Sequence, residues 1–219
     1  MLFWFSSFVS LGLYVLASGA PTVQVGSTAV TGASLPDVQR DFFGGRQPYT
    51  EPPVGSLRFS APILKLDPGV SSLDATKFGV AVFRVLNILL LATGLVSEIS
   101  EDRLTVNVFR HAGMNPSSSL PVMVWVHGGG FFQGSASMHN GSAIGAQSAL
   151  YGTSVVYAHL NYRLGPLGFP QGEEAETLGE TNLGNKDVIT ALIWIKQNIG
   201  AFGGDEGKIT IFGEVQDLS

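Results

Sequence analysis

The chain of 219 residues contains no cysteine, which excludes both a disulfide framework and a thiolate metal site. Charged residues make up only 13% of it, too few for a disordered or coiled-coil chain. The net charge of −5 argues against nucleic acid and against an anionic membrane surface as partners. With 28 glycines, the composition is that of an α/β protein with many tight turns.

The first nineteen residues carry no charge at all. Leu2 to Ala17 is apolar apart from three serines, and Ala17-Ser18-Gly19 supplies the small residues of a cleavage site. We predict that residues 1–19 are a signal peptide and that the protein is secreted. An uncleaved membrane anchor is the alternative, although the apolar run is short for a bilayer. Asn140-Gly141-Ser142 is a glycosylation sequon, so Asn140 is the predicted glycosylation site.

The hydrophobic pattern predicts strands joined by turns. The stretch 22–31 alternates like a strand or a hairpin broken at Gly26. The stretch 42–59 is rich in glycine and proline, which predicts an irregular surface segment. The stretch 83–96 is almost wholly aliphatic and is interpreted as a buried helix or a segment that covers a loop. Further strands are predicted at 104–109, 120–126, 154–160 and 208–212.

A helix is predicted from Asp187 onward. Val188, Leu192, Ile195 and Ile199 recur at helical spacing on one face, and Gly203-Gly204 ends the pattern. Strands that alternate with glycine-rich turns and a crossover helix indicate an α/β fold with a mainly parallel central sheet and flanking helices.

The apolar strand 120–126 runs into His127 and then into Gly128, Gly129 and Gly130. Three glycines leave backbone N–H groups free of side-chain cover. Such donors can stabilise a developing negative charge, as in an oxyanion hole.

Further motifs occur in a definite order along the chain. With this arrangement the chain resembles the type-B carboxylesterase/lipase family, secreted fungal members in particular, which have the α/β-hydrolase fold. The motifs that carry the resemblance are Glu51–Phe59, Ser100–Val108, His127–Phe131, Asn161–Gly165, Asn198–Asp205 and Ile209–Glu214.

The resemblance implies that residues 20–219 are the N-terminal part of an α/β-hydrolase domain, incomplete at its C-terminal side. It implies a carboxylic ester hydrolase that acts through a serine acyl-enzyme on a small-molecule or lipid ester, with no cofactor and no metal. The oxyanion hole would be formed by Gly129 and Gly130, within an oxyanion loop that includes His127, Gly128 and Phe131. Phe131 and Phe132 would form part of the acyl pocket. The oligomeric state stays open.

The resemblance fails where the nucleophile is expected. The nucleophile elbow needs Gly-x-Ser-x-Gly, but Val215 stands at the serine position and Asp217 at the second glycine. Arg103 likewise stands where the family has a cysteine. We therefore expect no catalytic triad residue in this chain. The other histidines, His111, His139 and His159, are interpreted as structural residues in loops or at a strand end.

Agreement with the family stops abruptly after Glu214. Because every valine codon begins with GT, the dinucleotide that opens most introns, we expect Val215–Ser219 to be intron read-through or a frameshifted exon. The strand at 208–212 would then be an exposed edge, which predicts poor solubility. Two alternatives stay open: a catalytically inactive secreted binding module, and a product that does not fold.

Overall fold

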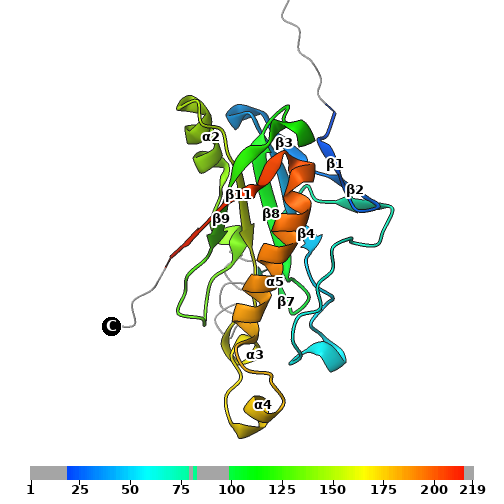
Figure 1. Cartoon of the computed structure of the whole chain (residues 1–219), viewed down its shortest axis with the longest axis vertical. Coiled ribbons are helices and arrows are strands. Elements are labelled where there is room, and N and C mark those ends of the chain that lie inside the picture. The colour runs from blue at the N-terminus through cyan, green and yellow to red at the C-terminus, as the bar shows by residue number, and fades with distance from the viewer. Residues whose placement is uncertain (1–18, 79–80, 83–98, 215–219) are drawn as a thin grey trace, which may run out of the picture.

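A computed structural model of the chain describes residues 19–78, 81–82 and 99–214 (Figure 1). The predicted signal peptide lies outside these ranges except for Gly19. The aliphatic segment 83–96 and Val215, at the predicted nucleophile position, also lie outside the described residues.

A six-stranded sheet forms the centre of the structure, in the order β11-β9-β10-β8-β4-β3. β9 pairs in parallel with β10 on one side and with β11 on the other. The pairs β10–β8, β8–β4 and β4–β3 are antiparallel. The α/β fold class is thus confirmed, but the sheet is mixed, and the expected parallel arrangement holds for three strands only. The six strands of the central sheet are β3 Ala33–Leu35, β4 Arg40–Pro48, β8 Thr105–His111, β9 Leu120–Val126, β10 Val156–Leu160 and β11 Gly204–Gly213.

Two smaller sheets accompany the central one. Of the strand and the hairpin that the sequence left open for 22–31, the structure has the hairpin, because β1 (Thr22–Val25) and β2 (Thr28–Thr31) pair antiparallel around Gly26. β5 (Ser72–Asp74) then adds to β2 in parallel. The third sheet is the short pair of β6 (Ala81–Val82) and β7 (Ile99–Ser100).

The prediction of an irregular segment over 42–59 is wrong for its first part. Residues up to Pro48 belong to β4, and Phe42 and Phe43 are buried in the core. The glycines that indicated a loop lie at a register shift between Phe43 and Gln47. Such a bulge lets a strand carry glycine and end on a proline. The rest of the segment is irregular, with one short 3₁₀ helix at Gly55–Leu57.

Helices cover both faces of the central sheet (Figure 1). The predicted helix is confirmed as α5, Leu183–Asn198, followed by a 3₁₀ turn that ends at Gly203. Trp194 and Ile195 of α5 are fully buried against one face of the sheet. α2 (Ser142–Leu150), which the sequence analysis did not predict, lies on the other face, where Ile144 packs against Phe42, Phe109 and Tyr157. The remaining described helices are the short α3 (Gly165–Gly168) and α4 (Glu173–Thr177).

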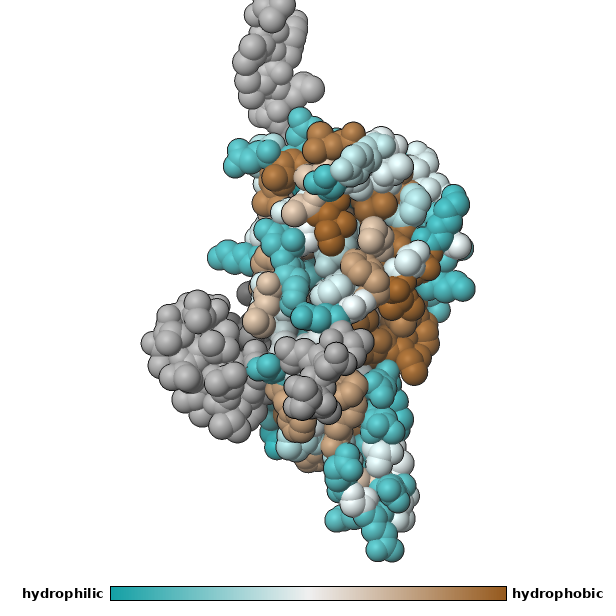
Figure 2. All heavy atoms as spheres, turned by 90° about the vertical axis from the view of Figure 1, so that its left-hand side faces the viewer, coloured by the Kyte–Doolittle hydropathy of each residue, from teal (hydrophilic) through white to brown (hydrophobic). Residues whose placement is uncertain are grey.

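β11 is the last strand of the central sheet among the described residues. Its Ile211 is 54% exposed, and Ile189 and Ile193 of α5 are exposed as well. Figure 2, which views the molecule from the left-hand side of Figure 1, shows apolar surface among the hydrophilic residues. Within the described ranges, no helix has the length and apolar character needed to cross a membrane.

Candidate functional site

The glycine loop begins where β9 ends. β9 lies between β10 and β11, and all three strands point the same way. The carboxyl ends of parallel strands are where α/β folds place their binding sites. The loop that follows Val126 therefore has the position expected of a site.

Left-handed backbone angles shape this loop. Gly129 and Gly130 have positive φ angles of 126° and 57°, and Phe131 has 63°. The Gly129 carbonyl accepts hydrogen bonds from the N–H groups of Phe132 and Gln133, both at 3.0 Å. A Cβ atom on Gly129 would lie 1.8 Å from the Gln133 oxygen, so only glycine fits. In the described part of the chain, the N–H groups of Gly129 and Gly130 donate to no acceptor.

His127 braces the start of the loop. Its ring stacks on Tyr162 with the ring centroids 4.5 Å apart, and its Nδ1 donates to the Gly128 carbonyl at 3.0 Å. The Tyr162 hydroxyl donates to the His127 carbonyl at 2.8 Å. Burial raises the pKa of Tyr162 to about 12, so this donor keeps its proton at neutral pH. Gly134 is also required, because a Cβ atom there would lie 2.1 Å from His127 Nδ1.

The end of β11 meets the same loop. Gly213 pairs with Val126, and a Cβ atom on Gly128 would lie 2.7 Å from the Glu214 carbonyl oxygen. The Glu214 carboxylate also lies 3.8 Å from His139 Nε2. β11 therefore brings the chain to Gly128, at the start of the glycine loop.

Phe131 and Phe132 are placed differently from one another. The Phe131 ring lies 4.6 Å from the Phe169 ring, and its carbonyl accepts from Gly165 N–H at 2.7 Å. Phe131 is nevertheless 52% exposed, and Phe132 is 70% exposed. Both offer apolar surface beside the glycine loop, and their role in an acyl pocket stays a prediction.

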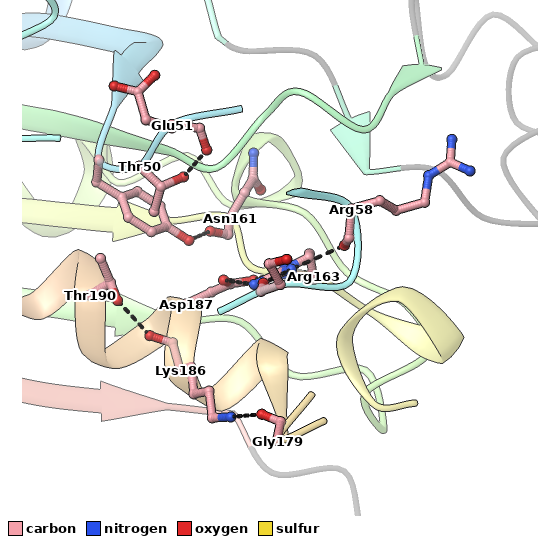
Figure 3. A network of polar contacts seen from close by, with 11 residues as sticks. Thr50, Glu51, Arg58, Asn161, Arg163, Gly179, Lys186, Asp187 and Thr190 are labelled. Carbon is pink, nitrogen blue, oxygen red and sulfur yellow. Dashed lines mark hydrogen bonds and ion pairs between the residues drawn. The ribbon is translucent and has the colours of Figure 1, made fainter. Parts of the chain in front are cut away.

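Residues that follow β10 hold the segments around the glycine loop together. The Asn161 side-chain oxygen accepts from Ala136 N–H at 2.8 Å and ties the two loops together. Arg163 pairs with Asp187 of α5 through Nε at 2.8 Å and Nη2 at 2.7 Å (Figure 3). The Arg163 Nη1 also donates to the Ser60 carbonyl at 2.8 Å. Sequence reasoning missed Asp187, although an acidic residue beside an apolar helical face is a signal for a buried ion pair.

The other predicted residues lie apart from the loop or beside it. His111 ends β8, His139 lies in a loop, and His159 is completely buried within β10. Burial, together with the nearby His139 and His127, lowers the pKa of His159 to about 3, so this ring is neutral at physiological pH. Asn140 is exposed, and its side-chain oxygen accepts from Ser142 N–H at the start of α2.

Among the described residues there is no cluster of three side chains that could hold a metal ion.

Comparison with known proteins gives a consistent result. The sequence model of the carboxylesterase family matches residues 20–216. The para-nitrobenzyl esterase of Bacillus subtilis is 43% identical over 171 residues, covering 76% of this chain and 33% of the esterase. Lipase 1 of Geotrichum candidum is 37% identical, covering 89% of this chain and 38% of the lipase. The crystal structure of Aspergillus niger EstA matches with a TM-score of 0.75 and 32% identity, covering 89% of this chain and 35% of EstA. The chain thus spans 33% and 38% of the length of these two curated relatives.

Proposed function

Because the chain belongs to the carboxylesterase family, we propose that its glycine loop supplies the oxyanion hole of a carboxylic ester hydrolase. The observation that carries this proposal is that the N–H groups of Gly129 and Gly130 donate to no acceptor among the described residues, in a loop whose Gly128 lies against Glu214 after β11. The substrate class is a small-molecule or lipid ester, in keeping with the esterase and lipases that the chain resembles. The chemistry requires neither a metal nor a cofactor.

The chemical role of the loop follows from ester hydrolysis by serine. A serine oxygen attacks the ester carbonyl carbon, and the carbonyl oxygen takes up the negative charge of the tetrahedral intermediate. The N–H groups of Gly129 and Gly130 would stabilise that oxygen. Collapse of the intermediate releases the alcohol and leaves an acyl-enzyme, which water then hydrolyses to the carboxylate.

We infer further that these 219 residues do not perform the reaction by themselves. Valine has no nucleophilic atom, and Val215 stands at the position that the family resemblance gives to the serine. The purified chain should neither hydrolyse p-nitrophenyl butyrate nor be labelled by a fluorophosphonate. Ester cleavage that a fluorophosphonate silences would refute this inference.

A chimera tests the oxyanion loop itself. Residues 20–214 would replace the matching segment of the para-nitrobenzyl esterase of Bacillus subtilis, which supplies the remainder of its own chain. We expect the chimera to hydrolyse p-nitrophenyl butyrate. Gly129→Ala should lower its kcat at least about hundredfold, because the new Cβ displaces the oxyanion donors. Gly152→Ala is the matched control, since Gly152 has a φ of 69° and open space around it. Equal activity of the two variants would overturn the proposal.

We also propose that the protein is secreted. The uncharged N-terminal segment and the exposed sequon at Asn140 support this. Two of the relatives are named as secreted lipases, from Botryotinia fuckeliana and Gibberella zeae. Expression in a yeast host decides the matter: the chain should appear in the medium, without residues 1–19.

A further inference from the structure

Arg40 is a buried cation that has no anionic partner among the described residues. It begins β4 and is only 1% exposed. Within the described residues, its Nε and Nη1 atoms have no hydrogen-bond partner. A buried charge lowers stability unless it is paired, so an unpaired guanidinium points to a ligand that brings the missing charge.

The described surroundings of Arg40 offer no internal counter-ion. α2 covers it closely, because a Cβ atom on Gly145 would lie 2.8 Å from Arg40 Nε. The sequence of α2 contains no charged residue. The neighbouring Asp41 pairs with Arg110 at 3.2 Å, and as the next residue of the strand it faces the other side of the sheet. Asp37, in the adjacent 3₁₀ turn, is exposed and forms no described contact with Arg40.

An open pocket of about 390 Å³ lies beside Arg40. His111 lies opposite Arg40 on the neighbouring strand, and both line the pocket. Leu35, Pro36 and Ala112 give it apolar walls. The site therefore combines one fixed positive charge with apolar surface, and it is not formed by any residue of the glycine loop.

We propose that this pocket binds a short-chain monocarboxylate, with the carboxylate on Arg40 and the alkyl chain against Leu35, Pro36 and Ala112. The Nδ1 of His111 donates to the Ala112 carbonyl at 2.8 Å, because a carbonyl oxygen can only accept. A single guanidinium matches a single carboxylate. A dianionic phosphate would leave one charge unbalanced and would not use the apolar walls. The proposal does not depend on the proposed hydrolase function.

Calorimetric titration of the full chain tests the site with three probes at matched ionic strength: butyrate, its neutral analogue butyramide, and inorganic phosphate. Butyrate should bind, butyramide should not, and phosphate should bind more weakly than butyrate. Absence of butyrate binding would overturn the proposal. Equal binding of butyramide would overturn the role of the charge, and stronger binding of phosphate would overturn the choice of a monocarboxylate.

Two variants locate the site. Arg40→Gln should raise the Kd for butyrate at least about tenfold, because it removes the charged partner. Ala112→Leu narrows the pocket, leaves Arg40 in place and should also weaken butyrate binding, which decides the matter if Arg40→Gln does not fold. Arg58→Gln is the control, since Arg58 is a half-exposed arginine paired with Glu101 elsewhere on the surface. Unchanged affinity in Ala112→Leu, or an equal loss in Arg58→Gln, would refute the assignment.

Discussion

The buried ion pair between Arg163 and Asp187 can be removed by Arg163→Met. The change keeps an unbranched side chain of similar length and deletes the guanidinium. Asp187 is completely buried and Arg163 is nearly so. Two side-chain hydrogen bonds to the carboxylate are lost, and so are those from Nη1 to the carbonyls of Arg58 and Ser60. Only the bond from the Arg163 backbone N–H to Asp187, at 3.0 Å, is retained.

The expected cost is about 3–5 kcal/mol in the free energy of unfolding, because a buried carboxylate is left without its partner. The double variant Arg163→Met/Asp187→Leu should regain most of this loss, since no buried charge remains. Arg58→Met is the matched control. It deletes an ion pair whose arginine side chain is 49% exposed, and such pairs contribute at most about 1 kcal/mol.

The loss should also depend on pH. Burial raises the pKa of Asp187, and contacts with Arg163 oppose this rise. In Arg163→Met the burial effect dominates, so the folded-state pKa moves further above its unfolded value. A raised pKa contributes stability that is present below the unfolded value and is lost as pH rises through the folded value. The deficit relative to the natural chain should therefore be smaller in mild acid than at neutral pH.

Urea unfolding followed by tryptophan fluorescence measures these differences, because Trp194 of α5 is fully buried and reports on the same helix. Two results would refute the reasoning. One is a loss in Arg163→Met no greater than in Arg58→Met. The other is a double variant as unstable as Arg163→Met.

Three further predictions concern separate parts of the chain. His159 has a pKa lowered to about 3, so protonation of the unfolded chain should reduce stability as pH falls from about 6.5, by at most about 1.4 kcal/mol per pH unit. His159→Leu should remove that part of the slope in urea titrations at several pH values, and an unchanged slope would contradict it. Asn140→Gln should abolish a shift in electrophoretic mobility that a glycosidase also removes from the secreted chain, whereas a shift that persists in the variant would disprove the site. Ile211→Lys should raise the soluble fraction after centrifugation, because lysine discourages edge-to-edge association of β11, and a soluble natural chain that the change does not improve would count against this.

Local pattern predicted those elements whose burial leaves a periodic signal. The unbroken apolar run of β9 and the helical spacing in α5 both correspond to observed elements. The pattern failed for β4, since glycines that suggest a loop are tolerated at a bulge when neighbouring strands supply the pairing. It also missed α2, whose residues show no apolar face in the sequence.

The sequence by itself determined the chemistry that the glycine loop can offer, because three consecutive glycines after a buried strand leave backbone donors without side-chain cover. Only the tertiary structure decided which groups face one another. It put Glu214 beside Gly128, stacked His127 on Tyr162, and left Arg40 beneath an uncharged helix. These contacts join residues far apart in the chain, and no local spacing encodes them. They depend on strand register and helix packing, which follow from the burial of the whole core.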